Sequence, residues 1–388
     1  MATWDECEQF DDLEIRIFGI STERYCAEFQ MPDGERRKAD LPPIPSVLRA
    51  SISEPREYGI HLFSWLFRGD VGEAFNEARI LAENPSRGFD VYRAARIRLR
   101  LWLDPNYPEL SQLNWECLYN PDEYEPLCLS IPFSRFIRAK SSRSQLILDR
   151  PLRMLLITSN PSNTDSFEFS DIKLDVAPKL LQLDRLETNP TLEKIYNKIV
   201  SAQESEPDNH YHIIHLQSHA EIRDEGAYIV LTDDRGRAEE IPYEVIYQRL
   251  GHDHYRSPYL VFLATPIREW EQCQKLARLA FRLVDAGVCA VVTTNAPIGK
   301  DTLHQFTQQF YDTLLRSGSI DMAISKARSK IYISRDWEYS YPILYTSATD
   351  VQMFQPLSEK LEYQLFTVNQ SIGNISIGKV TGWNAQKF

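Results

Sequence analysis

The sequence lacks a membrane-spanning segment, a secretory signal and closely spaced cysteine pairs. No run reaches the roughly 18 to 20 apolar residues that a membrane-spanning helix needs. The first residues have neither the basic segment nor the apolar segment of a secretory signal. The six cysteines are scattered and form no CxxC pair. We therefore expect a cytoplasmic protein with reduced thiols and no membrane span.

Positive charge is also scarce, because 43 Lys and Arg residues face 55 Asp and Glu residues, giving a net charge of -12. Phosphate binding needs clustered basic side chains, so nucleic acid and anionic membranes are not expected as the main partners. What is present suits a folded protein. The chain has 388 residues and 43% hydrophobic residues, enough for one large domain or two ordinary ones.

The first 149 residues carry patterns of mixed type and predict a small, strand-rich α+β module. Period-two alternation predicts strands, the first two as a hairpin, near 13–19, 24–31, 95–103 and 127–137. Residues 60–81 have helical spacing that is interrupted near Gly69, which predicts a helical pair or a kinked helix. In the third strand, Arg96, Arg98 and Arg100 alternate with apolar residues, and we expect these arginines to form a solvated face.

From residue 150 to about 355, short apolar strands alternate with segments of helical length, which predicts a parallel sheet flanked by helices on both faces. The predicted strands are 152–158, 211–216, 259–264, 288–293 and 342–346. The predicted helices are 171–183, 191–203, 242–250, 271–286, 301–316 and 319–332. A small hairpin is expected from Tyr228 through the Asp233 to Gly236 turn.

The stretch from Asn209 to Ala220 predicts a buried strand that delivers His219 to a loop at the carboxyl end of the sheet, where ligands bind in such folds. His210, His212, His215 and His219 do not suit a metal site. The first two share a strand face, His215 points to the other, and His219 lies beyond the strand. No phosphate-binding loop is present either, so neither a metal nor another cofactor is expected.

Several motifs in order resemble the CHAT domain, a caspase-like cysteine peptidase family of prokaryotes. They are the strand ending in Ser218-His219-Ala220, the strand Tyr259–Pro266, the strand Asp285–Val292, and the helices Phe306–Leu315 and Ala323–Arg328. Residues 94 to 119 are similar to the module that often precedes such domains. The resemblance implies a caspase-like, mostly parallel sheet sandwiched by helices, with domains at 1–149 and 150–355 and a tail at 356–388.

The resemblance also implies the site, and there the sequence departs from the family. His219 is in the position of the family histidine, which activates a cysteine thiolate, but the cysteine position is Pro266. Proline offers neither a thiol nor the backbone N–H that would help to hold an oxyanion. Ala220 replaces the glycine whose N–H supplies the other oxyanion contact, which matters if that position needs a positive φ. The inherited peptidase mechanism is therefore expected to be absent.

Two other residues are candidates to replace the missing nucleophile. Cys273 follows Pro266 by seven residues and is expected on the first turns of the next helix, and Thr265 directly precedes Pro266. A lone helix cysteine is more often a packing residue, so Cys273 is the lesser hypothesis. Cys289 is expected in the core.

The tail from Val368 to Asn384 alternates Ile and Val with Asn, Gln, Ser and Gly and contains no proline, which is typical of segments that stack as cross-β. An edge strand followed by a frayed terminus is the plainer interpretation. The tail also resembles the amyloid-signalling segments of some bacterial immune proteins.

Three functions remain open at this point. The first is a pseudo-peptidase that serves as a signalling or assembly component of a prokaryotic immune or cell-death-like pathway. Its partners would be other proteins, such as a receptor or peptidase of that pathway, bound through residues 363–388. The second is an active cysteine endopeptidase that uses His219 and Cys273. The third is a scaffold that binds a peptide without cutting it. The oligomeric state is not predicted.

Overall fold

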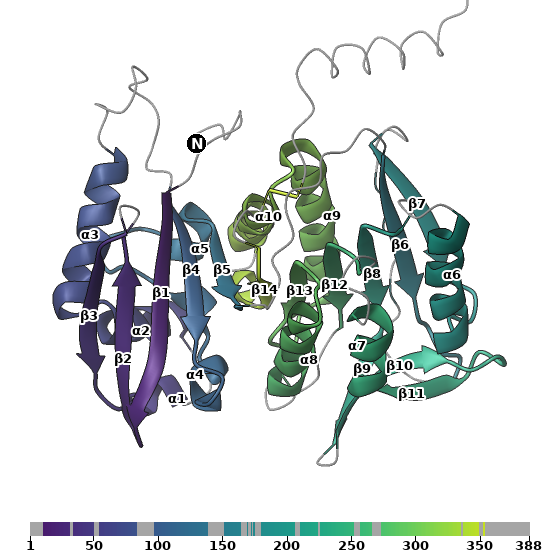
Figure 1. The fold of residues 1–388 in the computed structure, drawn as a ribbon, viewed down its shortest axis with the longest axis horizontal. Helices are drawn as coiled ribbons and strands as arrows, with labels where there is room; N and C mark the ends of the chain where they lie inside the picture. Colours follow the sequence, from purple (N-terminus) through teal and green to yellow (C-terminus); the bar gives the residue numbers. More distant parts are fainter. Residues whose placement is uncertain are drawn as a thin grey trace, which may run out of the picture. The chain divides into compact units, whose positions relative to one another are not determined.

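One long sheet organises the computed structural model (Figure 1). In the part of the chain that the structure describes, its eleven strands lie in the order β3-β2-β1-β4-β5-β14-β13-β12-β8-β6-β7. The described residues are 11–31, 34–49, 54–83, 97–138, 151–163, 169, 172, 174, 180–205, 210–223, 226–251, 257–265, 273–334, 337–348 and 352–353. The tail predicted at 356–388, the loop containing His252 and His254, and Pro266 lie outside these residues.

The amino-terminal strands form one end of the sheet. They are β1 (Asp11–Ser21), β2 (Arg24–Gln30), β3 (Arg36–Leu41), β4 (Ile97–Leu103) and β5 (Phe133–Phe136). The predicted hairpin is confirmed, because β1 pairs antiparallel with β2, and β4 adds to β1 in parallel. The predicted helical pair is also confirmed.

The helices of this region are α1 (Ser46–Arg49), α2 (Pro55–Leu66), α3 (Gly69–Glu83), α4 (Pro108–Gln112) and α5 (Leu127–Ser130), with a 3-10 turn, η2 (Trp115–Cys117). Gly69 has a φ of 52°, which explains why the chain breaks there, since glycine adopts that conformation with the least strain.

The remaining strands build the part of the sheet that carries the candidate site. They are β6 (Leu152–Thr158), β7 (Leu181–Leu186), β8 (Ile213–Gln217), β12 (Leu260–Ala264), β13 (Ala290–Thr294) and β14 (Pro342–Thr346). Four neighbouring pairs are parallel, and only β14 runs antiparallel to β13. Every residue of β6, β8, β12, β13 and β14 is buried, as the continuous apolar runs predict.

Helices cover both faces of this part of the sheet, as predicted. One face packs against α9 (Lys300–Ser317) and α10 (Ile320–Ser334), through side chains such as Phe306 and Ile324. The other packs against α6 (Leu192–Ser205), α7 (Tyr243–Gly251) and α8 (Cys273–Asp285), through side chains such as Ile195 and Leu279. None of the described helices is long and apolar enough to cross a membrane.

Three expectations about local structure are wrong. Residues 181–183, predicted as the end of a helix, belong to the strand β7 beside β6, and the Leu-Gln-Leu-Asp-Arg-Leu order of β7 is in fact a strand alternation. In the predicted strand 127–137, Leu127–Ser130 is helical and only Phe133–Phe136 is extended. His219 does not lie in a loop but begins a further strand, β9 (His219–Arg223).

The arginine face of β4 is also not solvated. Arg98 and Arg100 are 8% and 6% exposed. Arg98 pairs with Asp321 of α10 and with Asp12 of β1, and Arg100 also pairs with Asp12, at 3.0 Å. Asp12, whose side chain is 39% exposed, thus pairs with both buried arginines.

A small antiparallel sheet branches off after β8. It consists of β9, β10 (Gly226–Thr232) and β11 (Ala238–Pro242), in the order β11-β10-β9. The hairpin predicted around Asp233 is confirmed, and Asp233 accepts hydrogen bonds from the backbone N–H groups of Arg235 and Arg237 in its turn.

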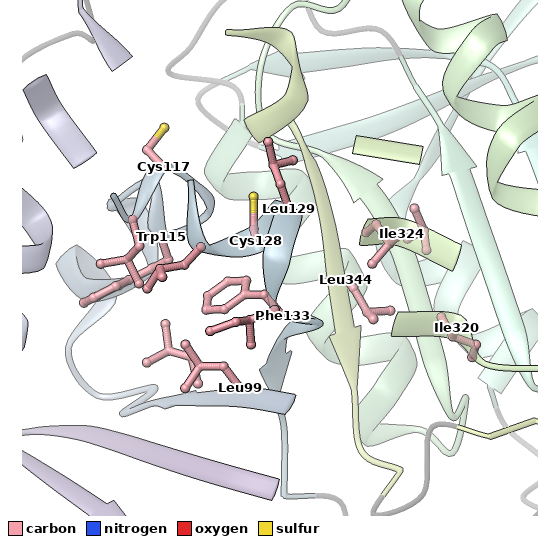
Figure 2. Packing of buried hydrophobic residues seen from close by; sticks show 14 of the residues in the cluster. Leu99, Trp115, Cys117, Cys128, Leu129, Phe133, Ile320, Ile324 and Leu344 are labelled. Atoms are coloured by element: carbon pink, nitrogen blue, oxygen red, sulfur yellow. The ribbon is translucent and has the colours of Figure 1, made fainter. Parts of the chain in front are cut away.

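The two parts of the long sheet meet where β5 pairs in parallel with β14, and we call this junction the seam. Strands from both sides of residue 150 thus belong to one sheet. Figure 2 shows the apolar packing at the seam, where Leu99 and Phe133 on one side share a core with Leu344 and Ile324 on the other.

The seam also encloses three fully buried charged side chains. Glu116 in η2 binds Arg135 of β5 through two contacts, of 2.6 and 3.1 Å. Arg135 also donates to the carbonyl oxygens of Ser111 and Leu113. Arg328 of α10 lies 4.0 Å from Glu116 and donates to the carbonyl oxygens of Pro342 and Phe133. Every one of these charges is paired, which such burial requires.

Candidate functional site at the carboxyl edge of the sheet

The candidate site lies where β6, β8 and β12 end together. Main-chain pairing aligns Thr158 of β6 and Ala264 of β12 with Gln217, the last residue of β8. Their carboxyl ends therefore form one edge, as expected for parallel neighbours. Ser159, Ser218 and Thr265 follow these strands directly and lie side by side along the edge.

His219 follows Ser218 at this edge, as the sequence predicted, although in β9. Its side chain is 9% exposed, and its ring lies 5.1 Å from the ring of Phe169, at an interplanar angle of 49°. Pairing with Val230 of β10 holds its backbone. The histidine is thus fixed by a strand on one side and an aromatic ring on the other.

Ala220 is extended and pairs with Ile229 of β10. The described non-glycine residues with positive φ are Glu23 and Asn189, so Ala220 is not among them. Alanine therefore fits this position without backbone strain.

The other two predicted site residues are placed only by the backbone around them. β12 ends at Ala264, and Thr265 is its last described neighbour before Pro266. Cys273 is the first residue of α8, which agrees with the predicted helix. The position expected for the nucleophile therefore follows the strand next to the one that precedes His219.

Three buried hydroxyl groups lie side by side at this edge; hydroxyls without a described partner also occur elsewhere in the fold, at Ser134, Thr232, Tyr243, Thr293 and Thr302. The side chains of Ser159, Ser218 and Thr265 are fully buried, and their hydroxyl oxygens have no hydrogen-bond partner among the described residues. We call these three residues the hydroxyl row. They continue the alternation of Ile157, Leu216 and Leu263, which places them on the face covered by α6, α7 and α8. Such unsatisfied groups are rare in native proteins and call for an explanation.

The backbone groups of the hydroxyl row form hydrogen bonds with neighbouring residues. The N–H of Ser159 donates to Gln217 O at 2.8 Å, and the N–H of Ser218 donates to Ala264 O at 3.3 Å. The hydroxyl of Thr294 donates to Thr265 O at 3.2 Å. The backbone therefore fixes the positions of side chains that themselves lack partners.

The next strand extends this row with an amide. By the register of β12 and β13, Asn295 lies beside Thr265. Its Nδ2 donates to Asn114 Oδ1 at 2.8 Å, while its Oδ1 is buried and has no partner in the described part of the chain. The edge thus offers neutral hydrogen-bonding groups, three of which can both donate and accept.

His215 lies further back on β8 and has a structural environment. It is fully buried, its ring stacks on Phe262 at 4.5 Å, and its Nδ1 lies 2.9 Å from the hydroxyl of Tyr311. Burial lowers the pKa of His215 to about 3. The imidazole is therefore neutral in the folded protein at physiological pH.

His210 and His212 also fit the prediction of packing or network histidines. Their rings lie 4.8 Å apart, and His212 Nδ1 accepts the backbone N–H of Arg153 at 2.9 Å. Among the described residues, no group of three or more His, Cys, Asp or Glu side chains could hold a metal ion. Cys289 is buried in the core, as predicted, and Cys26, Cys117 and Cys128 are also buried.

Sequence reasoning missed the hydroxyl row, although a signal was present. Each strand of the edge is a run of apolar residues that ends in a hydroxyl-bearing residue, at Ser159, Ser218 and Thr265. The shared feature becomes visible only when the register shows that the three positions are neighbours.

The fold and the site together define a class: an α/β protein with a histidine at the carboxyl edge of a mostly parallel sheet, next to the strand that would carry a nucleophile. A family model for the CHAT domain matches residues 57–356. The chain belongs to the CHAT domain family.

Two solved structures of the Saccharomyces cerevisiae separase–securin complex are similar to this chain. The first shares 9% sequence identity with this chain, with a TM-score of 0.49. The second shares 11% sequence identity, with a TM-score of 0.46. Each covers 87% of this chain but only 30% of the compared chain. This chain thus spans less than a third of the length of those neighbours. A search of curated protein sequences gives no significant match.

Proposed function

We propose that this CHAT domain protein is a pseudo-peptidase, which has kept the architecture of a cysteine peptidase and lost its nucleophile. It would act as a signalling or assembly component of a prokaryotic immune or cell-death-like pathway by binding another protein, such as a receptor or peptidase of that pathway.

The observation that carries this proposal is the residue that follows β12. In the sequence, Ala264 and Thr265 lead into Pro266, where the family resemblance expects cysteine. Proline removes the attacking sulfur and one N–H donor to an oxyanion, and one such donor is typically worth about 3 to 4 kcal/mol of transition-state stabilisation. His219 remains held at the edge by β10 and Phe169.

The experiment compares the parent full-length chain with His219→Ala and Cys273→Ala. Each is incubated with reduced, unfolded casein, and intact-mass spectrometry follows both the casein and the chain itself. We expect no cleavage above background in any of the three, while trypsin cleaves the same casein. Cleavage by the parent that both substitutions abolish would refute the proposal.

That refuting result would support a second candidate, an active cysteine endopeptidase that uses Cys273. One observation favours it, since Cys273 is the first residue of α8. A helix amino terminus lowers the pKa of a thiol and increases the thiolate fraction. The separate Cys273→Ala measurement distinguishes this chemistry from contamination by another peptidase.

The tail at 363–388 is proposed as the recruitment element, because its alternating Ile and small polar residues suit β-templating by a similar segment. Deleting residues 356–388 should abolish thioflavin-positive assembly of the full-length chain at high concentration and leave the melting temperature unchanged. A parent chain that stays monomeric and thioflavin-negative, alone and with fibrils of the tail peptide, would remove this part of the proposal.

A further inference from the structure

A polar hollow lies beside the helix α3 in the amino-terminal part of the chain. Its volume is about 550 Å³, and it is lined by Arg79 of α3, by Asn120 and by residues 122–125 of the loop between η2 and α5. We call it the acidic hollow, because three of these side chains are carboxylates and one is a guanidinium. The excess of negative charge favours a ligand that carries positive charge.

The loop that supplies the carboxylates is held by hydrogen bonds. Asn120 accepts twice, from the N–H of Asp122 on its Oδ1 at 3.1 Å and from the N–H of Glu123 on its main-chain oxygen at 3.0 Å. The N–H of Leu127 donates to Leu118 O at 2.9 Å and closes the loop at its base. A loop that is ordered before binding loses little conformational entropy when a ligand arrives.

The carboxylates of the acidic hollow are not all paired. Arg79 forms an ion pair with Glu123. The side chains of Asp122 and Glu125 form no ion pair or hydrogen bond within the described part of the chain. Partial burial raises the pKa of Glu125, and the charge of Glu123 adds to this effect. A bound cation would relieve this unfavourable accumulation of negative charge.

Asn120 is a second and independent observation, and it indicates what else the ligand carries. The residue is 5% exposed and lines the acidic hollow. Its Oδ1 is used by the turn, but its Nδ2 has no hydrogen-bond partner among the described residues. An amide N–H cannot bind a cation and needs an acceptor such as a main-chain carbonyl oxygen. The ligand should therefore combine a positive charge with a carbonyl oxygen, as a peptide does.

Tyr124 narrows the choice of cation. It is 97% exposed, and its side chain makes no hydrogen bond or aromatic contact with the described residues. A guanidinium group stacks on a tyrosine ring and also pairs with carboxylates through its planar fork. The three carboxylates are not grouped closely enough to hold a metal ion, since the described residues include no such group. An arginine side chain thus suits the acidic hollow better than a metal ion.

We propose that the acidic hollow binds an arginine side chain presented by a peptide segment of another protein. The guanidinium pairs with the carboxylates of Asp122 and Glu125 and stacks on Tyr124, and a main-chain carbonyl oxygen next to the arginine accepts a hydrogen bond from Asn120 Nδ2. This inference goes beyond the proposed function, because the surface uses none of the candidate site residues at the carboxyl edge.

The probe for this surface is a short capped peptide that alternates glycine with arginine. The matched control has citrulline in place of arginine, which keeps the shape of the side chain and removes its charge. Isothermal titration calorimetry with the full-length chain measures both affinities, at low and at high salt. We expect saturable binding of the arginine peptide that weakens as salt screens the charges, and no binding of the citrulline peptide.

Substitutions in the acidic hollow give the second measurement. Asp122→Asn and Glu125→Gln should each weaken the affinity by about threefold, the effect of losing an exposed ion pair. Tyr124→Leu should have an effect of about the same size, whereas Tyr124→Phe keeps the ring and should bind as the parent does. Glu239→Gln is the control, because Glu239 is an exposed carboxylate on β11. It should leave the affinity unchanged.

One substitution should act in the opposite direction. Arg79→Gln removes the guanidinium that pairs with Glu123, so a third carboxylate becomes available to the peptide. The affinity for the arginine peptide should therefore increase by about threefold. Mere damage to the loop would weaken binding, and a weaker affinity in Arg79→Gln would contradict the electrostatic account.

Four results would overturn the inference. They are equal binding of the citrulline peptide, parental affinity in both Glu125→Gln and Tyr124→Leu, displacement of the peptide by micromolar calcium ions, and a dimer of the chain that Tyr124→Leu dissociates in sedimentation. The third would make the acidic hollow a metal site, and the fourth would make a second copy its occupant. Casein cleavage by the parent would contradict the pseudo-peptidase and leave this inference standing, whereas loss of peptide binding would leave the proposed function untouched.

Discussion

The seam and the carboxyl edge bury different kinds of polar group: the seam buries paired charges, although the hydroxyl of Ser134 in β5 has no described partner, whereas the edge buries neutral hydroxyls. At the seam, the fully buried Glu116, Arg135 and Arg328 all have charged or carbonyl partners. At the edge, the hydroxyls of Ser159, Ser218 and Thr265 are buried without a described partner. Polar groups that are satisfied hold elements together, whereas unsatisfied ones reduce stability and are found mainly where function requires them. The seam is therefore structural, and the edge is the functional candidate.

The helix α10, which contains the family motif Ala323–Arg328, has a structural role in this contrast. Asp321 and Arg328 of this helix are fully buried, and both reach partners in the amino-terminal strands. The helix thus holds the two ends of the long sheet together.

The largest expected effect comes from breaking the seam. Arg328→Met removes the donor to the carbonyl oxygens of Pro342 and Phe133 and one of the two cations beside Glu116, so the free energy of unfolding should fall by about 3 to 5 kcal/mol. Urea unfolding of the full-length chain measures it. Arg316→Met is the control, because Arg316 is exposed and pairs only with Asp312 on its own helix, and it should cost less than ~1 kcal/mol. Equal losses in the two variants would contradict the structural role of the seam.

A second prediction concerns acid and the strand that leads to the site. The pKa of His215 is about 3 in the folded protein, well below the ordinary value of 6.5, because the ring is buried. The unfolded chain therefore binds the proton more readily than the folded protein. The contribution of neutral His215 to the free energy of unfolding is full above pH 6.5 and is lost as the pH falls towards 3. At pH 5 the loss should be about 2 kcal/mol.

The measurement is the free energy of unfolding of the parent and of His215→Gln between pH 7 and pH 5. Glutamine cannot take up a proton in this range, so the variant should show a shallower decline than the parent. His61→Gln, at an exposed position, is the control and should keep the parental slope. Identical slopes in the parent and His215→Gln would show that His215 is not the residue that titrates.

Much of the fold was predictable because buried parallel strands are short apolar runs, and β6, β8, β12 and β14 were found in this way. The charged face of β4 was not predictable. Alternating arginines look the same whether they face water or ion pairs, and Asp321 lies 223 residues from Arg98. Likewise, 181–183 was misjudged because a short edge strand and a helix segment have similar composition. His219 was found from sequence, but the hydroxyl row depends on register between strands that are far apart in the chain.

The smallest expected effects, but the most direct test, come from two threonines that differ mainly in their partners. Thr265 and Thr346 are both fully buried at strand ends, but Thr346 donates to Cys289 O at 2.9 Å and accepts the N–H of Ala348, whereas the Thr265 hydroxyl has no described partner. The decisive measurement is urea unfolding of Thr265→Val and Thr346→Val in the full-length chain without ligand. We predict that Thr346→Val lowers the free energy of unfolding by about 1 to 3 kcal/mol and that Thr265→Val leaves it unchanged or raises it by up to ~1 kcal/mol. A comparable loss in both would contradict the distinction between the bonded hydroxyl of Thr346 and the unpartnered hydroxyl of Thr265.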